Sequence, residues 1–215
     1  MLKLNRTSVE APECLARYNH VVKKWDNIDS GDKRQVSECL ERLQAKRCAY
    51  CECALFDDDH IEHFRRKNPA YFPQLTFAWD NLFLSCNSAN HCGHYKDRRS
   101  ADPYDPNHLI KPDNHDSGYF LYFHSSGEVR VRSGLQGNDL HCAEETIRVF
   151  GLQHGGLNHA RRQVLSRYWR ENENLLDDLM SWSNVDRDDY ISLEIEDGRN
   201  KPHASVIAHF LQKTH

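Results

Sequence analysis

Apolar residues recur at helical spacing in one stretch of the N-terminal quarter of the chain. Between Asp32 and Lys46 they occupy one face and charged residues fill the other, which predicts an amphipathic helix leading into Cys48. Ser30, just upstream, is a suitable N-cap. We interpret residues 1–47 as a helical N-terminal flank whose apolar stripe faces the core.

Shorter apolar runs in the middle of the chain predict strands. Residues 60–64 and 82–85 carry aliphatic, aromatic and β-branched side chains over lengths typical of strands. Pro69 and Pro73 make the segment between them irregular. Residues 87–99 are polar and have room for a short helix.

The C-terminal half combines a predicted β-hairpin with a long helical region. Residues 119–123 and 128–132 flank a Ser-Ser-Gly turn, which is the pattern of a hairpin. Helical periodicity returns at 141–150, continues through 159–182 and ends at 203–211. These elements predict an α+β fold with mostly helical N- and C-terminal flanks.

Composition limits the ways in which the chain can act. Its 215 residues are enough to bury a substantial core. Lys and Arg number 28 against 32 Asp and Glu, a net charge of −4, so any contact with nucleic acid has to be local. No run approaches the roughly 18 apolar residues of a membrane helix, and no secretion signal is evident. We expect a soluble, cytoplasmic protein that makes no membrane contact.

Four of the eight cysteines form two pairs, which predicts a metal site. Cys48 and Cys51 have the spacing usual for zinc ligands, whereas Cys86 and Cys92 lie farther apart. In the absence of a secretion signal, thiolate ligation explains these pairs better than disulfides do. Two short loops that each present two thiolates can hold one tetrahedral structural Zn²⁺.

Alternative ligands and an alternative chemistry remain open at this site. Cys53 could replace Cys51, and His91 could replace Cys92 or, three residues before His94, serve a second metal. A Cys-x-x-Cys pair can also be a redox dithiol, but that pair normally begins a helix in a βαβ unit, a context absent here. We expect the remaining cysteines to be reduced: Cys14, Cys39, Cys53 and Cys142.

The polar residues between and after the cysteines follow a recognisable order. Glu62-His63, then Asn81, then Cys92-Gly-His94-Tyr-Lys96 resembles the HNH endonuclease superfamily, in which two strands and a helix enclose one divalent metal. The resemblance implies a zinc-stapled ββα-metal core at 48–99. It further implies that Glu62 and His94 bind Mg²⁺ or Mn²⁺, that His63 is the general base, and that Asn81 orients the loop around His63.

Phosphodiester hydrolysis suits these residue types. A cation offsets the charge growing on the phosphate, and a histidine with a pKa of about 6.5 can take a proton from water near neutral pH. A regular strand would place His60 and Glu62 on one face and His63 on the other, so either the strand ends there or His60 belongs to the metal site. Gly93 stands where the superfamily usually has Asn or His, which makes His94 the substitute ligand.

Positive charges flank the expected site. Arg65, Arg66 and Lys67 follow the first expected strand, and Lys96 follows the last cysteine. These side chains could contact the phosphates of a nucleic acid. An ordinary solvated surface has the same composition.

Three segments resemble a narrower group of HNH proteins, the PtuB-type effectors of Septu and retron anti-phage systems. They are Cys48-Ala-Tyr-Cys-Glu52, Ile61-Glu-His-Phe-Arg65 and Leu75-Thr-Phe-Ala-Trp-Asp-Asn-Leu82. Two C-terminal pieces, Ala143-Glu-Glu-Thr-Ile147 and Pro202-His-Ala-Ser-Val-Ile-Ala-His-Phe-Leu211, are similar to this group too, so the likeness extends over most of the chain. This likeness implies a nuclease effector that works with an ATPase of the ABC or SMC-like kind and, in retron systems, with a reverse transcriptase and its RNA–DNA product. The sequence has no Gly-rich phosphate loop of its own. The apolar stripe between residues 164 and 180 could dock a partner or pack on the chain's own core.

A rival interpretation needs only the cysteines. A noncatalytic zinc-binding module that bridges partners or holds nucleic acid would keep both cysteine pairs without requiring His63 or Asn81. Under the nuclease interpretation, the target could be DNA or a structured RNA such as tRNA, because a single-metal site does not itself select the sugar.

Overall fold

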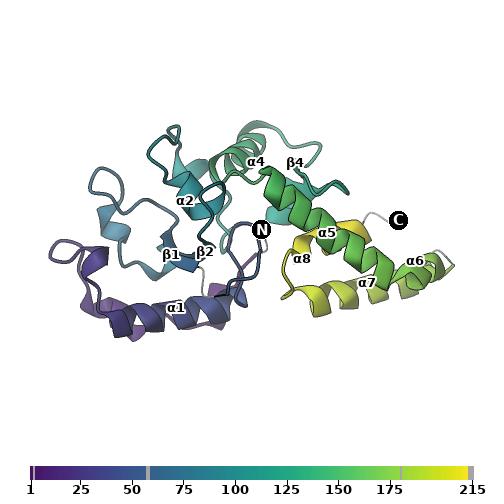
Figure 1. The fold of residues 1–215 in the computed structure, drawn as a ribbon, viewed down its shortest axis with the longest axis horizontal. Helices are drawn as coiled ribbons and strands as arrows, with labels where there is room; N and C mark the ends of the chain where they lie inside the picture. Colours follow the sequence, from purple (N-terminus) through teal and green to yellow (C-terminus); the bar gives the residue numbers. More distant parts are fainter. Residues whose placement is uncertain (2, 57–58, 180, 213–215) are drawn as a thin grey trace.

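The computed structural model describes residues 1, 3–56, 59–179 and 181–212. Within these ranges the chain is mostly helical, with two small antiparallel hairpins and a cluster of four cysteines (Figure 1). The expected α+β class is therefore confirmed. No helix in the described ranges has the length and apolar character needed to cross a membrane.

Helix α1, Ser30–Gln44, forms where the apolar spacing predicts it. Val36 and Leu40 on its apolar face are completely buried. Asp29, and not Ser30, caps the helix, because its carboxylate accepts a hydrogen bond from the amide of Gly31 at 2.8 Å. Three short 3₁₀ helices precede α1, at Arg6–Ser8, Glu13–Arg17 and Trp25–Asn27.

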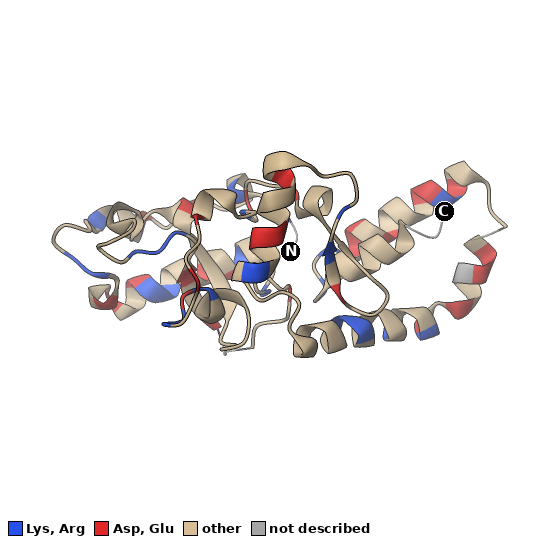
Figure 2. Cartoon of the chain, turned by 90° about the horizontal axis from the view of Figure 1, so that it is seen from above, with Lys and Arg blue, Asp and Glu red and all other residues tan. Residues whose placement is uncertain are grey.

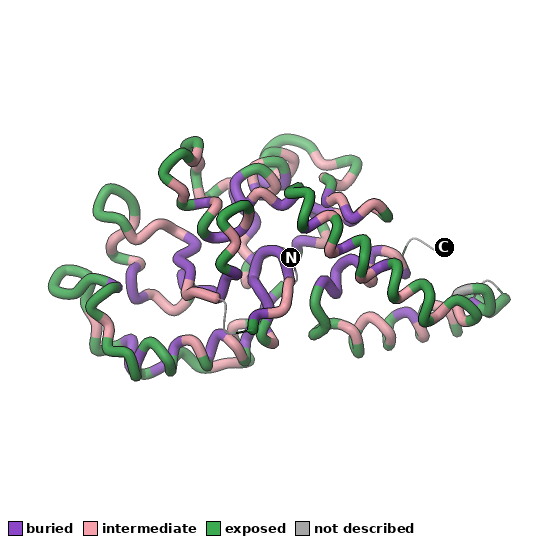
Figure 3. Tube along the Cα trace, viewed as in Figure 1, coloured by how far each residue is buried: buried purple, intermediate pink, exposed green. Residues whose placement is uncertain are grey.

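The first hairpin lies at the centre of the N-terminal half. Strand β1, Asp59–His63, pairs antiparallel with β2, Leu82–Cys86. All five residues of β2 are buried. Figure 3, drawn in the same view as Figure 1, shows buried backbone where Figure 1 labels β2. Two 3₁₀ turns, Pro73–Leu75 and Trp79–Asn81, shape the connection between the strands, and helix α2, Cys92–Lys96, follows β2.

The second hairpin forms from β3, Leu121–Phe123, and β4, Val129–Val131. It is shorter than expected, since residues 117–120 form the helical turn α3, Ser117–Phe120. Gly127 is required in its turn, because its φ is +86° and a Cβ there would lie 2.0 Å from the carbonyl oxygen of Asn158. A 3₁₀ turn, Pro106–His108, precedes this hairpin.

Five helices complete the C-terminal half: α4, Gly137–Val149; α5, Gly155–Glu171; α6, Glu173–Leu179; α7, Asn184–Gly198; and α8, Ala204–Leu211. The single helical stretch expected at 159–182 is divided at Asn172 into α5 and α6. The apolar spacing did not predict α7. The acidic residues along α6 and α7 stand out in Figure 2. This end of the molecule lies opposite the end that carries α1 and the first hairpin (Figure 1).

The apolar stripe of the C-terminal helices packs largely within the chain. Leu179, Ile191 and Leu211 form a small second core, against which Tyr168 also packs. Trp169 nevertheless keeps 48% of its surface exposed. Met180, the last residue of the expected stripe, lies outside the described residues.

The turn that carries the first cysteine pair is attached to the C-terminal helices. The buried carboxylate of Glu52 pairs with the amino group of Met1. It also accepts hydrogen bonds from the Ser205 amide at 3.0 Å and from the Ser205 hydroxyl at 2.6 Å. The Glu52 carbonyl accepts from the amide of His203 at 3.1 Å. The N-terminal turn is thus held by the segment that begins α8.

Candidate metal centre and cleft

A tight turn presents the first two cysteines. Arg47 and Ala54 form an isolated antiparallel bridge that closes it. Inside the turn, the Cys48 amide donates to the Cys53 carbonyl at 2.9 Å, and the Glu52 amide donates to the Cys48 carbonyl at 3.0 Å. Glu52 adopts a left-handed backbone with φ of 65°, which reverses the chain directly after the pair.

The second pair comes from the end of β2 and the start of α2. The four Sγ atoms of Cys48, Cys51, Cys86 and Cys92 lie within 4.8 Å of one another, and those of Cys51 and Cys86 are 4.0 Å apart. Four Zn–S bonds of about 2.3 Å in a tetrahedron require sulfur atoms about 3.8 Å apart, so the cluster matches that geometry closely. All four residues are buried. The cluster could therefore bind a metal such as Zn²⁺.

His91, one of the alternative ligands, lies beside this set. The Nδ1 atom of His91 is 3.2 Å from the Sγ of Cys92 and 3.7 Å from that of Cys86. Its position suits a hydrogen bond to a coordinated thiolate. Hydrogen bonds from the Cys48 thiol and its neighbours lower the pKa of Cys86, whereas burial raises the pKa of Cys92. Cation binding would displace the protons that remain.

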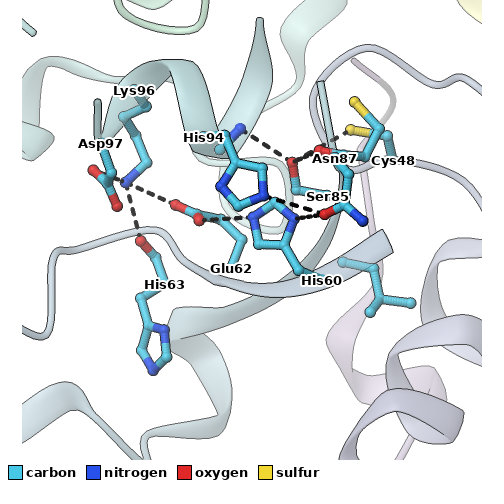
Figure 4. Close-up of polar contacts among 12 residues, drawn as sticks. Cys48, His60, Glu62, His63, Ser85, Asn87, His94, Lys96 and Asp97 are labelled. Carbon is cyan, nitrogen blue, oxygen red and sulfur yellow. Dashed lines mark hydrogen bonds and ion pairs between the residues drawn. The ribbon is translucent and has the colours of Figure 1, made fainter. Parts of the chain in front are cut away.

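A second polar cluster lies on the β1 face that carries His60 and Glu62; we call it the Glu62 cluster, and its other members are Asn87 and His94. The His60 and His94 rings are stacked with centroids 3.9 Å apart. Both rings contact the Oδ1 atom of Asn87, His60 through Nδ1 at 2.9 Å and His94 through Nε2 at 3.2 Å. The Nε2 atom of His60 is 3.4 Å from Glu62 Oε2 (Figure 4).

Gly93 makes room for this cluster. A Cβ atom at this position would lie 2.7 Å from Glu62 Oε2 and 3.0 Å from His60 Nε2. The Gly93 amide donates to the Ser85 hydroxyl at 3.1 Å, which holds the start of α2 against β2. The His60 ring and the Glu62 carboxylate therefore occupy the space that a side chain at position 93 would need.

Lys96 neutralises Glu62 inside the protein. Its ammonium lies 2.7 Å from Glu62 Oε1 and 2.8 Å from Asp97 Oδ1, and it donates to the His63 carbonyl at 3.2 Å. Burial opposes ionisation of Glu62, but the charges and hydrogen bonds of Lys96 and His60 together outweigh it and lower the pKa of Glu62 to about 2. Only 1% of the Lys96 surface is exposed, and its charge is paired with these buried carboxylates. The phosphate contact that the sequence allowed for Lys96 is therefore wrong.

His63 points away from the Glu62 carboxylate (Figure 4). Its Nε2 atom is 3.0 Å from the Thr76 carbonyl oxygen, and its ring meets Trp25 edge-on with centroids 4.7 Å apart. Since a carbonyl only accepts, Nε2 must carry the hydrogen and Nδ1 the lone pair. Burial, followed by the charge of Lys67, lowers the pKa of His63 to about 4. The ring is therefore neutral at pH 7.

Asn81 ties together the loop that supplies the Thr76 carbonyl. Its Oδ1 accepts from the Arg65 amide at 2.7 Å, and its Nδ2 donates to the carbonyls of Arg65 at 3.0 Å and Leu75 at 3.1 Å. The Asn81 carbonyl also accepts from the Phe64 amide at 2.9 Å. These bonds fix the chain on both sides of the hydrogen bond between His63 and Thr76.

One cleft of about 560 Å³ connects these features. Its lining includes His60, Glu62, His63, Gly93 and His94. Four basic residues line it as well: Arg66, Lys67, Arg98 and Arg99. Arg65 lies outside this lining, with its guanidinium 5.2 Å from the Phe72 ring centroid.

The sequence missed several members of this site. Asn87 carries no signal in the sequence, since its position depends on how β2 continues past its pairing with β1. Tyr71 also lines the cleft, but it lies in the irregular segment after Pro69, where no periodicity indicates a direction. Among the described residues, only the four cysteines place three or more ligand atoms within 4.8 Å of one another.

Comparison with known proteins adds no assignment. No family model matches the chain, and no curated protein matches it. The class that the structure defines is a mostly helical α+β protein with two small antiparallel hairpins and a buried four-cysteine cluster suited to a metal such as Zn²⁺.

Proposed function

We propose that the chain is a metal-dependent HNH endonuclease that hydrolyses phosphodiester bonds of DNA or RNA. In this proposal β1, β2 and α2 form a ββα-metal core within residues 48–99. The observation that carries it is the single cleft in which a buried carboxylate, three histidines and four basic side chains meet beside a Cys₄ cluster. Clustered perturbed groups in a cleft are typical of active sites.

The Glu62 cluster fits a divalent cation such as Mg²⁺ or Mn²⁺. The Nε2 atom of His60 is buried and faces Glu62 Oε2 at 3.4 Å, and the missing side chain at Gly93 leaves space beside both atoms. Glu62, His60 and His94 would hold the ion. When bound, the ion would offset negative charge on the phosphate and its leaving oxygen.

His63 suits the role of general base through its fixed tautomer. The Thr76 carbonyl leaves Nδ1 as the proton acceptor, and the pKa of about 4 keeps the ring neutral at pH 7, although it also makes the ring a weaker base than an ordinary imidazole. Its separation from Glu62 is compatible with hydrolysis, since the attacking and leaving oxygens lie on opposite sides of phosphorus. Asn81 is then a positioning residue that holds the loop around His63.

The cysteine cluster has a structural role in this proposal. Cys86 ends β2 and Cys92 begins α2, directly before Gly93 and His94. A Zn²⁺ ion bound there would fix the start of α2, and with it the approach of His94 to His60.

The proposal extends to the setting in which the nuclease acts. On the strength of the resemblance to PtuB-type effectors, the chain serves as the cleaving subunit of a prokaryotic anti-phage complex. An ATPase of the ABC or SMC-like kind is the proposed partner, joined in retron systems by a reverse transcriptase and its RNA–DNA product. The sequence lacks a Gly-rich phosphate loop, so nucleotide hydrolysis would come from that partner.

A cleavage assay tests the proposal. The assembled complex is incubated with phage DNA, host DNA and total RNA, once with added Mg²⁺ or Mn²⁺ and once with neither ion. We expect cleavage of at least one substrate that requires the added ion, and loss of cleavage in His63→Ala with zinc content and folding unchanged. A wild-type cleavage rate in His63→Ala would show that His63 takes no part in the mechanism. Failure to cleave any of the substrates, with or without added Mg²⁺ or Mn²⁺, would refute the nuclease proposal.

The noncatalytic zinc module is the second candidate. It is favoured by the fact that only the cysteine cluster is a complete ligand set within the described residues. Metal analysis does not separate the two candidates, because both contain zinc. A protein that binds nucleic acid or a partner, and that leaves all three substrates intact with Mg²⁺ or Mn²⁺, would support the module.

A further inference from the structure

The loop after β1 is preorganised at the edge of the cleft. The Phe72 amide donates to the Arg66 carbonyl at 3.0 Å, which closes the loop. Within it, the Tyr71 amide donates to the Asn68 carbonyl at 2.8 Å, and the Ala70 amide donates to the Asn68 side-chain oxygen at 3.0 Å. The backbone of the loop is therefore held in place before any ligand arrives.

Tyr71 presents an aromatic platform from this loop. It lines the same cleft as Glu62, yet 53% of its surface is exposed. The guanidinium of Arg66 lies 5.3 Å from its ring centroid. Arg66 is itself fixed by Asp97 Oδ1 at 2.8 Å and by the Lys96 carbonyl at 2.7 Å. The ring is thus braced by a cation and remains accessible to a ligand.

The charge around this platform favours an anionic ligand. Glu62 and Asp97, the acidic residues of the lining, are both paired with Lys96, and Asp97 also with Arg66. Lys67 and Arg99, with Arg98, add positive charge that these pairs do not offset. Figure 2 shows Lys and Arg on the loops at this end of the molecule, away from the acidic α6 and α7.

We infer that the cleft takes an unpaired nucleotide, whose base stacks on Tyr71 while its phosphates contact Lys67, Arg98 and Arg99. This inference rests on the proposed nuclease function and names its substrate class. A base within a duplex already has neighbours on both faces, so only an unpaired base offers a face to Tyr71. A volume of about 560 Å³ is also within the range of roughly 300–1,000 Å³ typical of pockets for small molecules. The substrate is therefore single-stranded nucleic acid or the loop of a folded one.

Equilibrium binding tests the inference without cleavage. Short fluorescein-labelled oligonucleotides, single-stranded and as the matching duplex, in DNA and RNA versions, are titrated with the zinc-loaded protein without added Mg²⁺ or Mn²⁺ and followed by anisotropy. We expect tighter binding of the single strands. Tyr71→Ala should weaken single-strand binding about 5- to 150-fold, the range for loss of one stacked base, and leave duplex binding unchanged.

Two variants serve as controls. Tyr71→Phe keeps the stacking ring and should bind like the wild type. Tyr119→Ala removes another half-exposed tyrosine, 55% exposed, which lines a different cavity, and it should have no effect. Circular dichroism checks the fold of each variant.

The outcomes separate this inference from the function on which it rests. Equal or tighter binding of the duplex, or unchanged single-strand binding in Tyr71→Ala, overturns the inference even if the wild type cleaves duplex DNA. If the wild type binds neither form and the complex cleaves nothing with Mg²⁺ or Mn²⁺, the nuclease proposal fails and the inference fails with it.

Discussion

Gly93→Ala tests the packing of the Glu62 cluster directly. The added methyl carbon would lie 2.7 Å from Glu62 Oε2 and 3.0 Å from His60 Nε2. The carboxylate cannot simply swing away, because its other oxygen is paired with the buried ammonium of Lys96 at 2.7 Å. Backbone retreat is opposed by the hydrogen bond from the Gly93 amide to Ser85. The substitution therefore forces a buried ion pair to move.

The magnitude follows from two opposing effects. Overpacking of a well-filled site costs about 1–3 kcal/mol. Replacing glycine with alanine also restricts the unfolded chain, which returns about 0.4–1 kcal/mol. The net expectation is a loss of between about 0 and 2.6 kcal/mol in the free energy of unfolding, with a middle value near 1.3 kcal/mol. In addition, Mn²⁺ binding at the Glu62 cluster should weaken, since the methyl group occupies the space between Glu62 and His60.

Gly155→Ala is the matched control. A Cβ atom at Gly155, the first residue of α5, meets nothing within 4 Å, so only the effect on the unfolded chain remains. This variant should gain about 0.4–1 kcal/mol. Urea denaturation of both variants, followed by circular dichroism, measures the difference. Equal stability of the two variants would refute the packing argument, and unchanged Mn²⁺ binding in Gly93→Ala would refute the proposed ion position.

Lys96→Met keeps an unbranched, slightly shorter side chain but removes the ammonium that pairs with the buried Glu62. We expect urea denaturation at pH 7 to show a loss of about 3–5 kcal/mol in the free energy of unfolding. Lys96 lowers the pKa of Glu62 in the folded protein. The wild-type pair therefore contributes its full stability above the unfolded pKa of about 4.3 and loses it as the pH falls toward about 2. If Lys96→Met lost stability over the same acid range as the wild type, this reasoning would be contradicted. Cys48→Ser should lower both the zinc content and the Tm. In a chain of this size, each kcal/mol of lost stability lowers the Tm by about 2–4 °C. Cys142 lies outside the cluster, so Cys142→Ser should keep its zinc. Elemental analysis and thermal denaturation measure both, and full zinc occupancy in Cys48→Ser would remove Cys48 from the ligand set.

The elements predicted correctly are those with strong local signals. Helix α1 has a continuous apolar stripe, and the two hairpins have short runs of strand-forming residues. Helix α7 lacks such a stripe, because Ile191 is buried whereas Val185 and Leu193 are 70% and 67% exposed. Periodicity therefore gave no indication of it.

The same distinction applies to the site. The four cysteines were predicted from spacing, since each pair is brought together by a local turn or by one strand and one helix. The burial of Lys96 depends on its meeting Glu62 across the space between α2 and β1, and neither residue signals the other in sequence. The position of the His60 ring depends on the absence of a side chain at Gly93. The closeness of these two residues follows from how α2 packs against the first hairpin, which the sequence does not show.

Glu52 depends on a part of the chain that is synthesised later. Its carboxylate follows directly on the first cysteine pair, yet two of its hydrogen bonds come from Ser205. A ribosome releases the N-terminal part first, at about 5–20 residues per second, so Glu52 emerges several seconds before the helix that satisfies it. During that interval the turn holds an ionisable group that has not yet acquired these two donors. Helix α8, which is synthesised after this turn, therefore completes the surroundings of the first cysteine pair, and a ribosome that stalls before α8 would leave this turn unfinished.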